Sequence, residues 1–322
     1  MNAAVLHTIN QLPHFEQFPE PVAEESEVIV RVRAAALKPI DKQMASGSHY
    51  AAYRKLPVVC GMDGVGCLDD GTRVFFGRPR PPYGSMSQNT VVSRSHCFPI
   101  PDAVDDDIAA AVVNPGLSAW GALAWRAQLK PGETVLILGA TGVTGKLAIQ
   151  TAKLLGAARV IAAGRNEQVL NTLHDLGADT TIRLDKTGQD LTEAFAREAD
   201  GNGFDVIIDY LWGDATEALL AAIARNDLKG ARSRVRLVDV GESAGPTISL
   251  AAAVLRSSRL EILGAGSGNA AASPEIWIEA VRQLMSNVAR GALRIDTERV
   301  PLSEVENAWH REPHGRREVI IP

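Results

Sequence analysis

Hydrophobic and polar positions alternate in two different ways along this chain. Over residues 1 to about 100, short apolar runs are broken by turn residues, and Val28–Arg33 alternates apolar and basic residues, which is typical of a half-buried strand. Further strands are predicted at Val58–Leu68, Arg73–Phe76 and Thr90–Ser93. This part of the chain is therefore predicted to be β-rich. A helical pattern with acidic residues in its first turn begins at Asp105.

From about residue 114 the pattern changes to strands that alternate with helices. Helices are predicted over Glu167–Leu176 and Ala215–Ile223. Strands are predicted at Thr134–Leu138, Arg159–Ala163, Thr180–Leu184, Asp205–Tyr210, Arg234–Val240 and Leu260–Leu263. Six strands joined by helical crossovers predict an α/β fold with a doubly wound parallel sheet.

The last part of the chain returns to mixed elements. One more helix is predicted over Pro274–Val288, with proline at an early helical position, and a strand over Glu318–Ile321. Between them lie the ordered segments expected at Leu293–Arg299 and Ser303–His310. The pattern of short apolar runs in the tail resembles that of the N-terminal part. We therefore expect the tail to fold back onto that domain.

The segment from Thr134 to Asn166 carries the strongest chemical signal. An apolar run ends at Gly139, and Gly142 and Gly145 follow before a stretch with apolar residues at helical spacing. Small residues at such a turn let the backbone approach a pyrophosphate, and the helix N-terminus offers unpaired N–H groups to the phosphates. The spacing is G-x-x-G-x-x-G rather than the commoner G-x-G-x-x-G, so a tight turn without a ligand is the alternative. A P-loop does not fit, because Ala140 and Leu147 occupy its glycine and Ser/Thr positions.

The end of the second predicted strand bears on the choice of cofactor. NAD-binding proteins usually place an acidic residue there to accept a hydrogen bond from the ribose 2′-hydroxyl. This chain has Gly164, Arg165 and Asn166, and the nearest acid is Glu167. A guanidinium matches the oxygens of a 2′-phosphate, so NADP(H) is favoured over NAD(H). The alternative is that Arg165 points to solvent.

Composition limits the classes of function. The 322 residues suggest about two domains, and the net charge of −5 gives no basic field for nucleic acid or an anionic membrane. No apolar run long enough to span a bilayer and no signal peptide are found. The cysteines are Cys60, Cys67 and Cys97, an odd number that fits free thiols in a reducing cytoplasm. We therefore expect a cytoplasmic protein with a small-molecule substrate, no nucleic-acid partner and no membrane.

Taken in order, the motifs of this chain resemble the medium-chain dehydrogenase/reductase superfamily, in particular its zinc-independent quinone oxidoreductase branch. The resemblance covers nearly the whole chain and rests on the opening AAVLHTINQLPHFEQFPEPVAEESEVIVRVRAAALKPID, then CGMDGVG, NPGLSAWGAL, LKPGETVLILGATGVTGKLAIQTAKLLGA and the closing VPLSEVENAWHR and GRREVIIP. It implies a GroES-like β-rich domain made by both chain ends, residues 1–113 and 268–322. It also implies a central Rossmann dinucleotide-binding domain, residues 114–267.

The resemblance also bears on metal. Zinc-dependent members carry a cysteine, a His-Glu pair and a Cys or Asp at positions that here hold Lys38, Met62-Asp63 and Asn114. Lysine and methionine are poor zinc ligands beside thiolate and imidazole, so no catalytic zinc is expected. Without zinc, reduction of a quinone or an α,β-unsaturated carbonyl by NADPH is the reaction that the resemblance implies.

Candidate site residues follow from the motif and the resemblance. The cofactor-binding candidates are Ser118, Thr141, Gly142, Val143, Thr144, Gly145, Gly164, Arg165, Asn166, Gly241, Ser243, Gly264 and Ser267. Among them, the loops 240–243 and 263–267 and Ser118 are expected beside the nicotinamide. The catalytic candidates are Lys38, Tyr50 and Asn114. Lys38 replaces the family's usual asparagine and could donate to a substrate oxygen, and the alternative is a solvated lysine.

Three other interpretations stay open at this point. The chain could bind NADPH as a sensor or structural protein with little turnover, it could use NADH, or it could be a zinc alcohol dehydrogenase. An exposed sheet edge at Leu260–Leu263 favours a homodimer.

Overall fold

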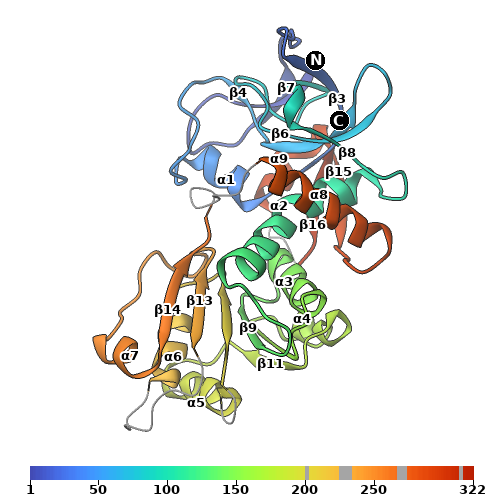
Figure 1. Ribbon diagram of the computed structural model, residues 1–322. Helices are drawn as coiled ribbons and strands as arrows, with labels where there is room; N and C mark the ends of the chain where they lie inside the picture. The colour runs from blue at the N-terminus through green and yellow to red at the C-terminus, as the bar shows by residue number, and fades with distance from the viewer. Residues whose placement is uncertain (200–202, 225–233, 267–273, 312–314) are drawn as a thin grey trace. The chain divides into compact units, whose positions relative to one another are not determined.

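The structure, a computed structural model, describes residues 1–199, 203–224, 234–266, 274–311 and 315–322. The chain forms two compact units, Met1–Asn114 with Ile276–Pro322, and Pro115–Glu275 (Figure 1). That one unit binds the cofactor and the other the substrate stays a prediction.

The unit formed by residues 115–275 is built on a six-stranded parallel sheet in the order β11-β10-β9-β12-β13-β14. Its strands are β9 (Thr134–Leu138), β10 (Arg159–Gly164), β11 (Thr180–Arg183), β12 (Val206–Asp209), β13 (Val235–Asp239) and β14 (Leu260–Gly264). Every residue of β9 is buried, as expected for a central parallel strand covered on both faces. The predicted doubly wound sheet is confirmed, and its strand order reverses between β9 and β12.

Helices follow most of these strands. They are α3 (Val143–Leu154), α4 (Glu167–Leu170), α5 (Gly188–Ala199), α6 (Asp214–Ile223) and α7 (Ala252–Ser257). The predicted helix over Glu167–Leu176 is wrong in its length, because a separate 3-10 turn forms at Leu173–Leu176. Thr172 explains the break: its hydroxyl donates to the carbonyl of Val169, a bond that competes with helix continuation.

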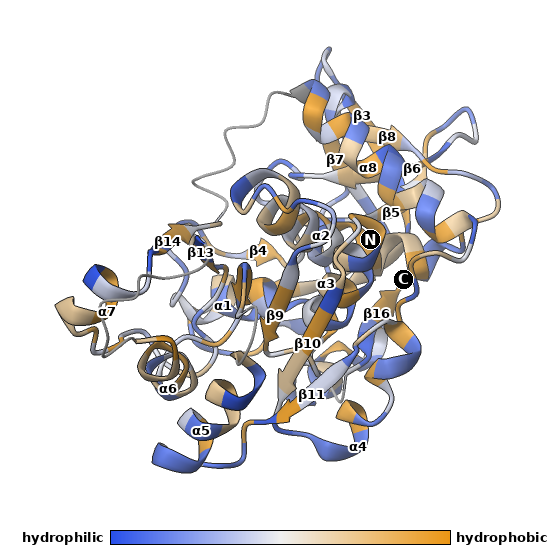
Figure 2. Ribbon diagram, turned by 60° about the horizontal axis from the view of Figure 1, so that its bottom comes forward, coloured by the Kyte–Doolittle hydropathy of each residue, from blue (hydrophilic) through white to orange (hydrophobic). Residues whose placement is uncertain are grey.

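The core of this unit lies between the sheet and its helices. Leu136, Ile161, Ile207 and Leu237 from four strands pack in one cluster with Phe195 of α5, and each is fully buried. Figure 2 shows β9 and β10 as largely hydrophobic, whereas α4 and α5 carry hydrophilic stretches. The buried residues of these helices are apolar, Leu170 in α4 and Leu191, Ala194 and Phe195 in α5.

The unit formed by the two chain ends is mostly antiparallel. One sheet has the order β2-β1-β4, and the other has the order β15-β16-β3-β5-β6-β8, with β7 paired to β3. The strands are β1 (Asn2–Leu6), β2 (His14–Gln17), β3 (Glu27–Ala36), β4 (Val58–Val59), β5 (Asp63–Cys67), β6 (Arg73–Gly77), β7 (Asn89–Ser93), β8 (Cys97–Pro99), β15 (Thr297–Pro301) and β16 (Arg317–Ile321). Because Val319 of β16 pairs with Ala36 of β3, the expectation that the tail folds back onto the N-terminal part is confirmed.

The remaining helices are α1 (Pro39–Ser46), α2 (Asp106–Trp120), α8 (Pro274–Ala289) and α9 (Val305–His310). The helix α2 continues as a π-helical turn, Gly121–Arg126. Within the described residues, the combined stretch is the one helix long and apolar enough to cross a membrane by length and composition. The sequence alone did not predict such a stretch. More than half of it is buried inside the protein, as the core helix of a globular protein would be.

Candidate functional site

In the glycine-rich turn between β9 and α3, the backbone at Gly145 lies close to the backbone of Gly139 and Ala140. Gly139 has φ +82°, a left-handed conformation that favours glycine. A Cβ atom on Gly145 would lie 2.4 Å from the carbonyl oxygen of Gly139 and 2.6 Å from the Cα of Ala140. These two glycines are therefore required by the turn itself, whether or not a ligand binds.

The middle glycine of the motif, Gly142, leaves the start of α3 open. Gly142 is the N-cap of α3 and is exposed, and it has no side chain that could accept from the first N–H groups of the helix. The first of these groups to donate within the helix is that of Lys146, to the carbonyl of Gly142 at 2.9 Å. The N–H groups of Val143, Thr144 and Gly145 precede it and are the orphan donors that an anion satisfies. A cradle of this kind fits the pyrophosphate of a dinucleotide.

Gly164 at the end of β10 is buried against this turn. A Cβ atom at Gly164 would lie 2.5 Å from Cγ2 of Thr141, so glycine allows the two segments to touch. The next two residues, Arg165 and Asn166, are exposed. The side chain of Asn166 accepts a hydrogen bond from the N–H of Val169 at 3.1 Å and so caps α4. The turn and the end of β10 are thus brought together.

The charges beside Arg165 differ from those of an NAD site. Glu167, the acid nearest to it in the sequence, forms an ion pair with Arg183 at 2.7 Å. Arg183 also pairs with Asp185. Arg165 itself forms no hydrogen bond or ion pair within the described part of the chain. Its guanidinium is therefore available, while the carboxylate of Glu167 already has a cationic partner.

The carboxyl ends of β12, β13 and β14 carry the loops expected beside the nicotinamide. Ser243 donates its hydroxyl to the carbonyl of Tyr210 at 2.9 Å, which ties the loop after β13 to the end of β12. Gly264 accepts a hydrogen bond from Nε of Arg126 at 2.8 Å, and Gly241 is half-buried. Ser118 is half-buried in α2, and Ser267 lies outside the described residues.

Two aspartates at this edge of the sheet were missed by the sequence reasoning. Asp209 ends β12 and Asp239 ends β13, and the two are opposite each other in the parallel register. The signal that could have found them is the acid that closes both apolar runs, VIID and VRLVD. Burial, together with the neighbouring charge of Asp209, raises the pKa of Asp239 to about 6.

Lys38 is not solvated, so that alternative is wrong. Its side chain is 1% exposed and lies between Asp41, at 3.1 Å, and Asp63, at 2.9 Å. Its third donor is used by the carbonyl of Ala36 at 2.9 Å. Burial opposes the charge, but the two carboxylates outweigh it and raise the pKa of Lys38 above its ordinary value. Lys38 is therefore a charged residue whose three donors are all engaged.

The other two catalytic candidates lie in different environments from Lys38. The side chain of Tyr50 is 71% exposed, and its ring contacts that of His49 at a centroid distance of 4.1 Å. Asn114 is exposed on α2. The structure therefore does not gather Lys38, Tyr50 and Asn114 into one buried cluster, and their catalytic roles stay predictions.

The positions that hold zinc in related dehydrogenases have a donor set that does not fit the metal. Lys38 presents an ammonium group that is bound to two carboxylates, and a cation cannot share that place with it. Over the described ranges, no group of three or more His, Cys, Asp or Glu side chains could hold a metal ion. Zinc needs deprotonated sulfur, nitrogen or carboxylate ligands, and the ammonium group of Lys38 is not one of them.

Comparison with known proteins places this architecture among oxidoreductases. A family model described as zinc-binding dehydrogenase matches residues 143–286. A quinone oxidoreductase of Pseudomonas aeruginosa is 29% identical over 303 residues, which cover 90% of this chain and 88% of the relative. A protein of Emericella nidulans named "Probable NADPH-dependent quinone reductase" is 26% identical over the whole of both chains. The crystal structure of a Pseudomonas syringae pv. tomato quinone oxidoreductase superimposes with a TM-score of 0.85 at 25% identity, over the full length of both chains.

Proposed function

Because this chain belongs to the medium-chain dehydrogenase/reductase superfamily, in its quinone oxidoreductase-like branch, we propose that it is an NADPH-dependent oxidoreductase that reduces a quinone or an α,β-unsaturated carbonyl. One observation carries the cofactor part of the proposal. The uncapped N-terminus of α3 and Arg165, which has no partner among the described residues, lie at adjoining carboxyl ends of β9 and β10, where doubly wound sheets bind dinucleotides.

The chain's own residues would hold the cofactor in three places. The N–H groups of Val143, Thr144 and Gly145 would bind the pyrophosphate, and Gly142 leaves room for it. Arg165 and Asn166 would meet the adenosine end. The ends of β12, β13 and β14, with Gly241, Ser243 and Gly264, would orient the nicotinamide. When bound, the reduced nicotinamide supplies a hydride, and a proton from water completes the two-electron reduction of the substrate.

The preference for NADPH over NADH rests on the charges at the end of β10. A 2′-phosphate carries two negative charges at neutral pH or slightly fewer, and a guanidinium binds such oxygens through two parallel hydrogen bonds. Arg165 is exposed and unpaired in the described structure, whereas Glu167 is held by Arg183. A bound 2′-phosphate would therefore be attracted by Arg165, and the charge of Glu167 that would repel it is offset by Arg183.

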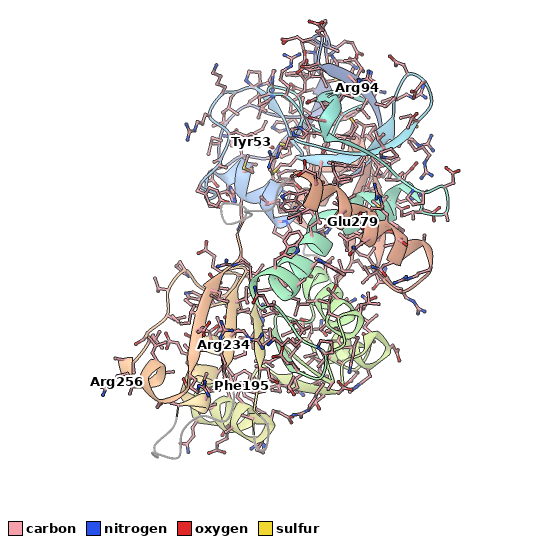
Figure 3. The ribbon with its side chains drawn as sticks, viewed as in Figure 1. Tyr53, Arg94, Phe195, Arg234, Arg256 and Glu279 are labelled. Atoms are coloured by element: carbon pink, nitrogen blue, oxygen red, sulfur yellow. The ribbon has the colours of Figure 1, made fainter. Side chains whose placement is uncertain are left out.

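Replacing Arg165 with alanine is expected to weaken NADPH binding by about 10- to 100-fold, the range for one charged hydrogen-bonding group. NADH binding should change little, because NADH has no 2′-phosphate. The measurement is a fluorescence titration of each reduced cofactor into wild-type and Arg165→Ala protein. Arg256→Ala is the matched control, because Arg256 is an exposed arginine of the same unit at the outer end of α7 (Figure 3).

If NADPH and NADH bind equally to the wild type, Arg165 does not select the cofactor and the enzyme uses NADH as readily. Failure of both cofactors to bind would contradict the redox proposal itself. The Arg256→Ala protein must behave as the wild type for the comparison to count.

The reaction is tested by following NADPH oxidation with a panel of quinones and enones. We expect turnover with at least one member, together with less than one zinc atom for every ten chains of purified protein. Tight NADPH binding without turnover on any member would favour the second candidate, a cofactor-binding sensor. Stoichiometric zinc would favour an alcohol dehydrogenase instead.

A homodimer is part of the proposal. The strand β14 lies at the edge of the parallel sheet, and Ile262 in it is 37% exposed. An exposed apolar edge strand is usually covered by another strand, and a second copy of β14 would provide one. Sedimentation at micromolar concentration is expected to show a dimer, and a monomer at that concentration would contradict it.

A further inference from the structure

The carboxyl ends of β12 and β13 carry the aspartate pair whose two members have different surroundings. Asp209 is fully buried, and its carboxylate accepts hydrogen bonds from the N–H groups of Leu211 and Trp212, at 2.8 and 3.0 Å, and from the hydroxyl of Thr216. These bonds close the turn that follows β12. The role of Asp209 is therefore to hold this loop.

Asp239 has no such set of donors. Its Oδ1 atom is buried and accepts no hydrogen bond from the residues that the structure describes. Burial and the charge of Asp209 act together to raise the pKa of Asp239, and the N–H of Gly241 offsets them only in part. Asp239 therefore exchanges its proton near pH 6, whereas an ordinary aspartate does so at about pH 4. A change of charge near pH 6 can be followed while the protein is folded.

The charged groups that face Asp239 come from the neighbouring strands and loops. Asp209 lies opposite it on β12, and Glu242 follows three residues later in an exposed loop. On the other side, Gly264 of β14 is its register partner, and Arg126 donates to the carbonyl of Gly264. Across the described ranges no ion pair joins Asp239 to Arg126 or to any other cation. Its carboxylate is thus a negative charge without a cationic partner among the described residues.

We propose that the charge of Asp239 sets the preference of this site between the oxidised and the reduced nicotinamide cofactor. The inference rests on the proposed function, in which the loop directly after Asp239 and the end of β14 meet the nicotinamide. The oxidised ring carries one formal positive charge and the reduced ring carries none, while the rest of the two molecules is identical. An ionised Asp239 therefore attracts the oxidised form alone, and a protonated Asp239 distinguishes the two forms much less.

The direction of the pH effect follows from this charge. Below about pH 6 Asp239 is protonated and the attraction for NADP⁺ is lost, so NADP⁺ binds more weakly relative to NADPH. Above that pH the carboxylate is ionised, and NADP⁺ binds more tightly relative to NADPH. By linkage, bound NADP⁺ must lower the pKa of Asp239 by the same free energy. Mild acid would thus favour release of the oxidised product from a reductase.

The experiment measures the dissociation constants of NADP⁺ and NADPH on the same protein between about pH 5.5 and about pH 7.5. The 2′-phosphate also titrates near pH 6, but both cofactors carry it, so the ratio of the two constants cancels that contribution. We expect the ratio Kd(NADP⁺)/Kd(NADPH) to fall by about three- to fourfold over this range in the wild type, the most that one group titrating near pH 6 can give. In Asp239→Asn, which has no charge to gain, the ratio should be flat and near its low-pH value.

Asp190→Asn is the matched control, because it removes an exposed carboxylate of the same unit that lies in α5, outside the loops proposed to meet the nicotinamide. Its ratio should keep the wild-type pH dependence. If Asp239→Asn does not fold, as judged by thermal unfolding, Asp239→Ser removes the same charge with a smaller side chain. A flat ratio in the wild type, or an unchanged slope without Asp239, overturns the inference while the proposed function stands. If neither cofactor binds at any pH, the proposed function is wrong and the inference is overturned with it.

Discussion

Replacing Lys38 with methionine is expected to lower the free energy of unfolding by about 3 to 5 kcal/mol, the cost of leaving a buried charge without its partner. Methionine has nearly the length of lysine, so the packing around residue 38 is kept while the ammonium group is lost. Asp41 and Asp63, which are 0% and 8% exposed, would then lose the ammonium group that both contact, although the charge of the buried Arg317 still acts on both. Urea unfolding of both proteins at neutral pH measures the difference.

The deficit should also depend on pH. Burial already raises the pKa of Asp63 above its ordinary value in the presence of Lys38, and removal of the ammonium raises that pKa further. A carboxyl group whose pKa is higher in the folded state destabilises the fold above that pKa and less so below it. The Lys38→Met protein should therefore approach the wild type in stability as the pH falls.

A matched control lies four residues further on, in the helix α1 that Lys38 precedes as its N-cap. Lys42 is half-buried and donates to the carbonyl of Arg311 at 3.2 Å, so Lys42→Met should cost about 1 kcal/mol or less. Equal effects of the two substitutions would show that the buried ammonium has no special role. A stable Lys38→Met protein with unchanged pH dependence would contradict the description of Lys38 as the charge that holds two carboxylates.

The second large effect is expected at the glycine turn. In Gly145→Ala the added methyl would lie 2.4 Å from the carbonyl oxygen of Gly139, so backbone atoms of the turn have to move. We expect a loss of about 3 kcal/mol in the free energy of unfolding, at the upper end for overpacking, because no flexible side chain can yield. Thermal unfolding measures it, and cofactor titration should show lost binding as well.

Gly142→Ala separates stability from binding at the same turn. A Cβ atom on Gly142 would meet only the Gly139 carbonyl oxygen, at 3.4 Å, so the fold should keep its stability within about 1 kcal/mol. The methyl group would, however, stand where the phosphates are proposed to approach, and NADPH binding should fall by at least about tenfold. Gly77→Ala, with nothing within 4 Å of the added atom, is the control in the other unit. Unchanged NADPH binding in Gly142→Ala would place the pyrophosphate elsewhere.

The parallel sheet was predictable because each of its strands is marked locally. Thr134–Leu138 was predicted with the bounds that the structure has, since the apolar run Val135–Leu138 ends at Gly139, a glycine with a positive φ. The length of the helix after β10 was not predictable in this way. A bond from the Thr172 hydroxyl to a backbone carbonyl breaks it, and apolar spacing does not report such bonds.

Part of the candidate cofactor site could be proposed from the sequence, and part of it could not. The turn from Gly139 to Gly145 brings together residues that are adjacent along the chain, so their spacing alone predicts the backbone cradle. The relation of Glu167 to Arg183 could not be foreseen, because it joins the start of α4 to the end of β11, which become neighbours only when the sheet forms. That pairing is the structural reason to favour a phosphate at Arg165.

The sequence by itself determined the fold class and the positions of the six parallel strands along the chain. It also determined the glycine turn that marks a dinucleotide site. These depend on the period of apolar residues and on conformations that neighbouring residues impose on each other. Only the tertiary structure decided the states of Lys38 and Asp239. The first is buried against a carboxylate 25 residues away, and the second faces Asp209 from a neighbouring strand. Burial and distant charges set the protonation of both groups, and neither can be read from the order of residues along the chain.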